Sequence, residues 1–256
     1  SPDDLAVIAA HTAEIINEFL AEKKVDIRLE HWSDPDTIGV AAVLKILSRR
    51  WLALSEAGYG FNTGEREEAF VLTNEDENNP RVIIEQVAGE MMVTIPVEGG
   101  YELSLVTHPV EEYPMSNMLL YLYMTAASFV SEPEKRYRGV MLPSLLFKDL
   151  RPDFSQLLGM YTIDANGGRW KITQALEQIR FAMGPYGISA VASFAAAVTL
   201  EICASEKKTP EEDIYVFQSS GLWALRRTGY IAPLMVGSFS RNEFSPIDVN
   251  ILDLGW

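Results

Sequence analysis

Between Glu68 and Leu105 the sequence repeats short apolar runs interrupted by turn-forming residues, and this pattern limits the folds open to the chain. The stretch from Asn74 to Pro80 consists of acidic and amide residues ended by a proline, which is typical of a solvated turn. Glu98-Gly99-Gly100 predicts a hairpin turn. Strand-length segments joined by such turns indicate β-sheet in this part of the chain.

Helical patterns flank the predicted strands. Ser1-Pro2-Asp3-Asp4 has the residues of a helix start, since serine suits the N-cap, proline the first turn and aspartate the positive end of the helix dipole. Apolar residues then follow at helical spacing from Leu5 to Phe19. We therefore expect a helix over residues 2–22, packed on a sheet face, and a second helical segment from Ser116 to Val130.

Further strands are expected in the remainder of the chain. The apolar segment from Ile38 to Trp51 fits either a buried strand or a helix. Strands are predicted within Val140 to Phe147, Lys171 to Met183 and Leu222 to Phe239. With no internal repeat and no low-complexity linker, the mixed pattern favours an α+β fold in which residues 1–256 form a single domain of β-sheets with packed helices.

Composition narrows the range of functions. The 256 residues carry a formal net charge of -15, whereas binding of nucleic acid usually needs a basic face, so no nucleic-acid partner is expected. No segment offers the roughly 20 apolar residues that span a bilayer, and no membrane association is expected. One cysteine, Cys203, and no Asn-X-Ser/Thr sequon favour an intracellular, reducing setting.

Signatures of catalysis and metal binding are absent from the sequence. It contains no glycine-rich phosphate loop, no His-Glu-X-X-His and no Cys-X-X-Cys. His11 and His108 have no second histidine or cysteine three or four residues away, and Cys203 has no adjacent base. The acidic run Glu75 to Glu77 lacks the alternating oxygen ligands of a calcium loop. We expect no cofactor, no metal and no enzymatic activity.

Five segments, in order and suitably spaced, resemble the serpin family of serine protease inhibitors. The most specific is Leu142-Pro143 through Asp149-Leu150 to Leu158-Gly159-Met160, which is similar to the family's "LPKF…DL…LGM". The other four are Ile8 to Leu20, Trp51 to Phe70, Val93 to Pro109, and Gln174 to Gly237 with its closing Thr228-Gly229 and Pro233-Leu234-Met235-Val236-Gly237. The first of these looks like the long helix that crosses the family's main sheet.

The resemblance covers the C-terminal two-thirds of the serpin fold. The family's N-terminal helices and strands have no counterpart here, which implies a fragment, a shortened member, or a separate chain that supplies the missing part. The resemblance also implies an exposed reactive-centre-like loop and, in inhibitory members, a metastable fold whose loop enters the main sheet as a new strand. The hinge of that loop corresponds to Gly187, Ile188, Ala190, Ala192 and Phe194, with alternate side chains facing the core.

The hinge departs from the inhibitory pattern in ways that oppose strand insertion. Phe194 stands where the family has a threonine, and overpacking a core costs roughly 1–3 kcal/mol. Pro185 cannot donate a ladder hydrogen bond. The polar pair beneath the family's sheet opening aligns with Val43 and Glu177. These departures favour a divergent, non-inhibitory protein that acts by binding a partner protein.

The alternative is a suicide-type protease inhibitor that uses residues 187–220 as bait for a protease. The small residues Ala195 to Ala197 still permit insertion of the loop. Counting along the family pattern places the scissile bond near Leu200, Glu201 and Ile202. A glutamate there suits a protease that cleaves after acidic residues and suits trypsin-like enzymes poorly, because their specificity pocket carries a carboxylate.

Overall fold

The fold is dominated by β-sheet. The computed structural model describes residues 5–34, 37–60, 68–74, 81–87, 90–107, 130–131, 135–151, 155–163, 169–176, 178–191, 211–217, 219–230, 232–240 and 243–244. A five-stranded antiparallel sheet has the order β1 (Leu5–Ala10), β2 (Gly39–Arg49), β14 (Gly187–Val191), β13 (Ile179–Gly184) and β10 (Leu145–Leu150). β14 contains the first three residues of the predicted hinge, Gly187, Ile188 and Ala190.

Two further sheets complete the main body. The six-stranded sheet has the order β17 (Met235–Phe239), β16 (Gly221–Arg227), β7 (Tyr101–Thr107), β6 (Glu90–Val97), β5 (Ile83–Val87) and β8 (Val130–Ser131). The four-stranded sheet has the order β15 (Ile214–Val216), β9 (Gly139–Pro143), β4 (Glu68–Thr73) and β3 (Leu54–Gly60). A two-stranded ribbon of β11 (Tyr161–Ile163) and β12 (Arg169–Lys171) follows the short 3₁₀ turn η2 (Ser155–Leu157).

The core lies between these sheets and is rich in aromatic side chains. Phe181 of β13 stacks on Trp223 of β16 with 4.3 Å between ring centroids, and both side chains are fully buried. Trp51, which follows β2, stacks on Phe70 of β4 at 6.0 Å. Large buried aromatic surfaces contribute much of the free energy of a core. These contacts fix the five-stranded sheet against the other two.

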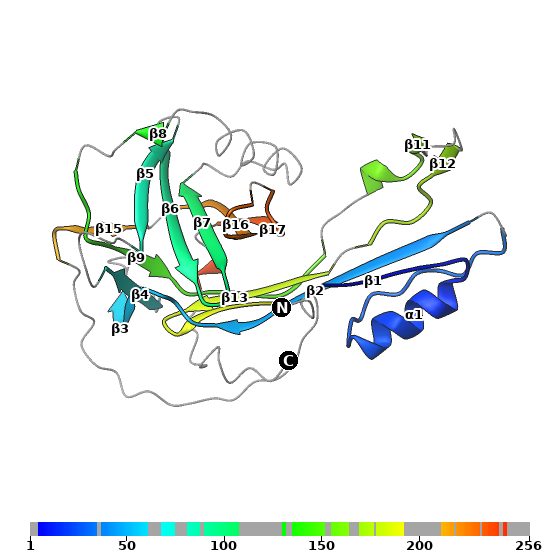
Figure 1. Ribbon diagram of the computed structural model, residues 1–256, viewed down its shortest axis with the longest axis horizontal. Helices are drawn as coiled ribbons and strands as arrows, with labels where there is room; N and C mark the ends of the chain where they lie inside the picture. The colour runs from blue at the N-terminus through cyan, green and yellow to red at the C-terminus, as the bar shows by residue number, and fades with distance from the viewer. Residues whose placement is uncertain are drawn as a thin grey trace.

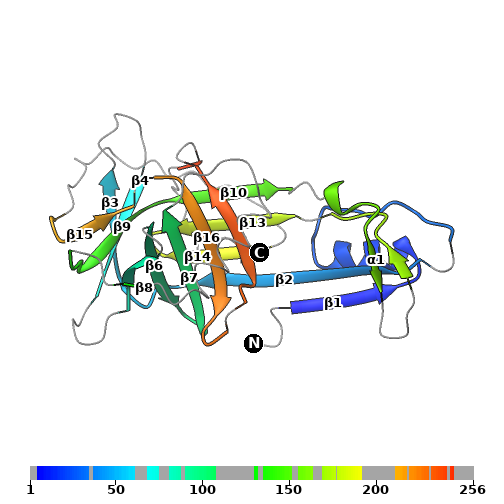
Figure 2. The same ribbon diagram turned by 90° about the horizontal axis from the view of Figure 1, so that it is seen from above.

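An arm extends from this body. β1, the outer half of β2 and the helix α1 (Ala13–Glu22) project together to one side (Figure 1), and β2 runs as one long strand from the body into the arm (Figure 2). α1 covers one face of the strand pair, where Ile16, Leu20 and Val25 pack on Val43 of β2. Val7 of β1, on the opposite face, is 59% exposed.

The structure corrects the predicted helix over residues 2–22. Residues 5–10 form β1, which pairs with β2 from Leu5 opposite Leu44 to Ala10 opposite Gly39, and the helix begins only at Ala13. Thr12, the N-cap residue, is extended, with φ -131° and ψ 146°. The β-branched Val7 and Ile8 suit a strand when a partner strand is present, so tertiary pairing overrides the helical spacing.

The other predicted elements are mostly strands. Val140 to Phe147 spans β9 and β10, and Leu222 to Phe239 spans β16 and β17. The described part of Lys171 to Met183 contains the end of β12 and most of β13 and no helix, and most of Ile38 to Trp51 is the strand β2. Among the described residues α1 is the single α-helix, so the expected set of packed helices is not found there. Residues 116–129 lie outside the described part.

Candidate functional site

The start of the predicted loop is a sheet strand. β14 lies between β13 and β2, antiparallel to both, with Ala190 opposite Phe181 on one side and opposite Ile46 on the other. Gly187 and Ile188 are buried, and the Ile188 side chain is fully so. The three described hinge residues, Gly187, Ile188 and Ala190, therefore already occupy the middle of the main sheet.

A two-residue turn joins β13 to β14. Gly184 pairs with Gly187, and Pro185 and Tyr186 form the turn between them. In a turn Pro185 has no ladder hydrogen bond to donate, so its missing N–H costs nothing there. The expectation that Pro185 opposes the entry of the hinge is wrong for this reason.

Gly187 is held against the backbone of β2. Its φ is +144°, and a Cβ atom added to it would lie 1.9 Å from the carbonyl oxygen of Arg49. No side chain fits such an approach, because real Cβ atoms are essentially never within 3.0 Å of another heavy atom. Glycine is thus required at this position both by space and by conformation.

Two side chains beyond the end of β2 clamp the turn. The Trp51 indole Nε1 donates a buried hydrogen bond of 2.8 Å to the carbonyl oxygen of Gly184. The Ser55 hydroxyl donates to the carbonyl oxygen of Pro185. Both turn carbonyls are satisfied by residues more than 100 positions away in the chain. Sequence reasoning placed Trp51 in a family segment but missed this role, since a partner so distant leaves no local signal.

The beginning of β13 is tied to the segment that follows α1. The backbone N–H of Asp26 donates to Gln178 Oε1 at 3.1 Å, and an Arg180 guanidinium nitrogen lies 2.5 Å from Asp26 Oδ2. The Arg180 side chain is 5% exposed and the Asp26 side chain 62%. A buried arginine needs such a carboxylate, because an unpaired charge in the interior is strongly destabilising. β13 is therefore held at both ends, by the arm and by the turn clamp.

The far end of the predicted loop is also anchored. β15 pairs in parallel with β9, Phe217 is fully buried, and Arg138 bridges Glu211 and Asp213, the latter at 3.1 Å. Burial raises the pKa of the Tyr215 hydroxyl to about 12. Residues 187–220 are thus not one exposed loop, because residues 187–191 and 214–216 are strands.

The other sequence-predicted site residues divide into two groups. Val43, where the family has a polar residue, is buried beneath α1 in an apolar cluster. Ala192, Phe194, Glu177 and the predicted scissile residues, Leu200, Glu201 and Ile202, lie outside the described residues. The structure brings together the hinge, Trp51 and Ser55.

The described residues hold no metal centre and no membrane-spanning helix. No group of three or more His, Cys, Asp or Glu residues suited to a metal ion occurs in the part of the chain that the structure describes. Over the same residues no helix has the length and apolar character of a membrane span. His31 lies outside any such group and contacts Glu14, with 2.8 Å between Nδ1 and Oε1.

Comparisons with known proteins gave matches among solved structures alone. No protein-family model matches the chain, and no curated protein matches it. Three solved structures are similar: a thyroxine-binding globulin complexed with thyroxine (12% identity, TM-score 0.47), Serpin48 of the insect Tenebrio molitor (13%, 0.44) and SRPN18 from Anopheles gambiae (16%, 0.40). They cover 88%, 88% and 90% of this chain, which spans 63%, 63% and 65% of theirs.

The fold resembles that of a serpin. The sheet order β2-β14-β13 puts the predicted hinge where the family resemblance expects an inserted strand. The quoted segments of sequence carry the same resemblance along the whole chain.

Proposed function

We propose that this chain is a non-inhibitory serpin-fold protein that acts by binding a partner protein and catalyses no reaction. The observation that carries the proposal is β14, a hinge already within the main sheet of the uncut chain. A bait mechanism needs this segment outside the sheet before cleavage and inside it afterwards. A hinge that is in the sheet from the outset has less left to insert.

The clamp around the turn adds support. Withdrawing β14 from the sheet would break its ladder with β2 and β13 and would expose Ile188 to water. The close approach of Gly187 to Arg49 would be lost as well. Each buried hydrogen bond contributes roughly 0.5–1.5 kcal/mol net, and burial of an isoleucine side chain roughly 1.5–3 kcal/mol. The inserted arrangement therefore keeps hydrogen bonds and apolar burial that a withdrawn one would lose.

The suicide-type inhibitor is the competing function. In that case residues 187–220 serve as bait, and the bond near Leu200, Glu201 and Ile202 is cut. The position of Pro185 is compatible with the inhibitor, because a proline in the turn does not oppose insertion of the hinge. The two functions differ in the product of a reaction with a protease. An inhibitor forms a covalent complex with the protease, whereas a binding protein is simply cut.

Incubation with a panel of serine and cysteine proteases separates the two functions. The panel includes one protease that cleaves after glutamate, with a trypsin-like enzyme as the matched control. We expect cleavage or no reaction and no SDS-stable complex with any member. A covalent complex with the glutamate-specific protease that Glu201→Ala abolishes would overturn the proposal and establish the inhibitor.

Partner binding needs its own measurement. Surface-immobilised protein is tested against candidate proteins before and after loop cleavage. A non-inhibitory binder retains its affinity within about twofold after the cut, because its fold does not change. Loss of binding only after cleavage would contradict the proposal.

A further inference from the structure

The arm carries a free strand edge. β1 is the outermost strand of the five-stranded sheet, and no strand of the described residues pairs with its outer side. Figure 2 shows β1 along the outer border of the arm. Such an edge presents backbone N–H and C=O groups to a further strand, and proteins usually protect it with a lysine, a proline or a bulge. Residues 5–10 contain no lysine or proline, and they pair with β2 without a shift of register.

The surface around this edge is uncharged. Residues 5–10 and 38–44 contain no charged side chain, although the chain has a formal net charge of -15. On the face of the arm opposite α1, Val7 of β1 and Val40 of β2 are 59% and 64% exposed, and Ala9 and Ala42 are exposed beside them. Two copies of so acidic a chain repel each other over much of their surface. At this edge they can meet without bringing like charges together.

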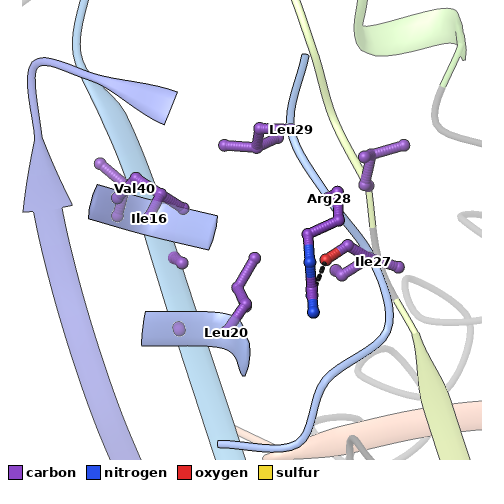
Figure 3. Close-up of a pocket in the computed structure, with 9 residues that line it drawn as sticks. Ile16, Leu20, Ile27, Arg28, Leu29 and Val40 are labelled. Atoms are coloured by element: carbon purple, nitrogen blue, oxygen red, sulfur yellow. Dashed lines mark hydrogen bonds between the residues drawn. The ribbon is translucent and has the colours of Figure 1, made fainter. Parts of the chain in front are cut away.

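The contacts of α1 show which side of the helix lies above the edge. Asn17 exchanges two hydrogen bonds of 2.9 Å with the backbone of Leu29, so the segment after α1 runs along one side of the helix. Figure 3 shows Leu29 across a space from Ile16 and Leu20. The same segment exchanges hydrogen bonds with Gln174, which precedes β13. Since β13 lies on the side of β2 away from β1, the other side of α1 lies toward the free edge.

An apolar stripe occupies that other side of α1. Ile15 and Phe19 are four residues apart, so they share one side of the helix, the side away from Asn17. Ile15 is 48% exposed, and Phe19 is half-buried. Lys23 lies over the Phe19 ring at 5.6 Å and is paired with Glu22 at 2.7 Å, so these two charges balance each other. The free edge of β1 therefore lies beside an apolar stripe that is partly open to water.

We propose that this chain forms a symmetric dimer in which the β1 strands of two copies pair edge to edge and antiparallel. An antiparallel strand pair is self-complementary, as the interface of a two-fold dimer must be. A register centred on Val7 keeps both α1 helices on one face of the joined sheets, because directly opposed residues share a face. Two strand spacings then separate the helix axes by roughly 10 Å, the distance of packed helices, with Ile15 and Phe19 between them.

The stripe on α1 favours a second copy over a strand from another protein. A single added strand would satisfy the backbone groups of β1 but would leave Ile15 and Phe19 exposed to water. A second copy brings its own α1 and covers the edge and the stripe in one contact. The inference goes beyond the proposed partner binding and is independent of it, because no residue of this edge belongs to the hinge or to the turn clamp.

The test is the mass of the intact chain and of charge variants in solution, measured by sedimentation over a range of concentrations. We expect the intact protein to reach twice the 28.6 kDa of the chain. Val7→Lys places two like charges opposite each other at the two-fold axis and should weaken the dimer by about tenfold or more, as should Val7→Glu. An equimolar mixture of these two variants should restore the dimer, because a lysine then faces a glutamate.

Val40→Lys is the matched control. Val40 is as exposed as Val7 and lies on the same face, but it belongs to β2, one strand away from the edge. This variant should dimerise like the intact protein. Equal weakening by Val40→Lys and Val7→Lys would mean that the copies pack face to face, and it would overturn edge pairing. A monomer at every concentration, or a mixture of the Val7 variants that stays monomeric, would overturn the proposal as well.

A second variant keeps the test decisive if the Val7 variants fail to fold. Ile15→Gln changes an exposed position of α1 and should weaken the dimer, since Ile15 would face the second copy. Ile163→Gln, at an exposed position of β11 outside the arm, is its control and should leave the dimer unchanged. An intact protein that dimerises equally well with and without Ile15→Gln would contradict the predicted contact between the helices and overturn this dimer.

Discussion

The hairpins β6–β7 and β13–β14 are both tight and largely buried, yet their turns are determined differently. Between β6 and β7, Val97 pairs with Tyr101 across the turn Glu98-Gly99-Gly100, whose glycines have φ +88° and +78°. Nothing lies within 4 Å of a Cβ added at Gly100. That turn therefore depends on the conformational freedom of its glycines. It is also bonded to distant residues, because the Glu98 N–H donates to the Arg50 carbonyl oxygen and the Thr228 N–H to the Gly100 carbonyl oxygen.

The turn between β13 and β14 depends on remote residues. Its two central positions are Pro185 and Tyr186, and the glycine after them is pressed against the backbone of Arg49. Trp51 and Ser55 hold its carbonyls. Both turns are thus bonded to distant residues, but the carbonyls of the β13–β14 turn accept from the side chains of Trp51 and Ser55, and its glycine is also fixed by close packing against Arg49.

The largest effect is expected at the glycines. Gly187→Ala should destabilise the fold by roughly 2–4 kcal/mol, because it adds an impossible contact with the Arg49 carbonyl to an unfavourable φ. Gly100→Ala is the control and should cost roughly 1 kcal/mol, since only the positive φ is at issue. Urea unfolding of both variants measures the difference, and equal losses would show that the two turns are alike.

A smaller loss is expected from the clamp tryptophan. Trp51→Phe leaves the buried Gly184 carbonyl without its donor, and we expect roughly 1–3 kcal/mol of destabilisation. Trp223→Phe removes a similar volume from a buried indole whose Nε1 has no hydrogen-bond partner among the described residues. Thermal unfolding should show the greater loss for Trp51→Phe. The opposite order would contradict a clamping role.

Ser55→Ala sharpens the comparison further. Ser55 is exposed, so loss of its bond to Pro185 should cost only about 0.5–1 kcal/mol of global stability. The local effect should be larger. Hydrogen exchange at residues 187–191 should accelerate, while exchange across the β6–β7 turn stays as it was. Acceleration at both turns would mean that the serine acts on the whole fold.

The smallest effect is expected from cutting the loop. Cleavage between Val198 and Ser205 should change the melting temperature little, because residues 187–191 are already a sheet strand before the cut. Each kcal/mol gained would raise the melting temperature of a chain of this size by roughly 2–4 °C. Differential scanning calorimetry of intact and cut protein measures the shift. A rise of tens of degrees would support the inhibitor instead.

Much of the sheet content was predictable from sequence, because turn residues and apolar alternation are local signals. The strands within Val140 to Phe147 and Leu222 to Phe239 follow from them, as does the turn at Glu98-Gly99-Gly100. The prediction of a helix over residues 2–22 was wrong at its N-terminal end, where residues 5–10 form β1. Leu5 to Ala10 suits a helix or a strand equally, and pairing with β2, some 35 positions along the chain, decides between them.

The candidate site was predictable only in outline. The family resemblance located the hinge at Gly187. Pro185 was predicted to oppose strand insertion, because the sequence does not show that the flanking strands place this proline in a turn. Ser55 carried no signal at all, because its acceptor lies 130 residues away.

That separation has a kinetic consequence. The Trp51 and Ser55 bonds span 133 and 130 residues, and β14 pairs with a strand about as distant. Closing such long loops costs chain entropy before any contact repays it, and proteins dominated by distant pairings fold slowly. The hairpin β13–β14 can form early from its own residues, but its docking beside β2 must wait until most of the chain has been made and collapsed. Newly synthesised chains should therefore pass through a state in which this edge of β2 is still open, and chaperones or unwanted strands can pair with it.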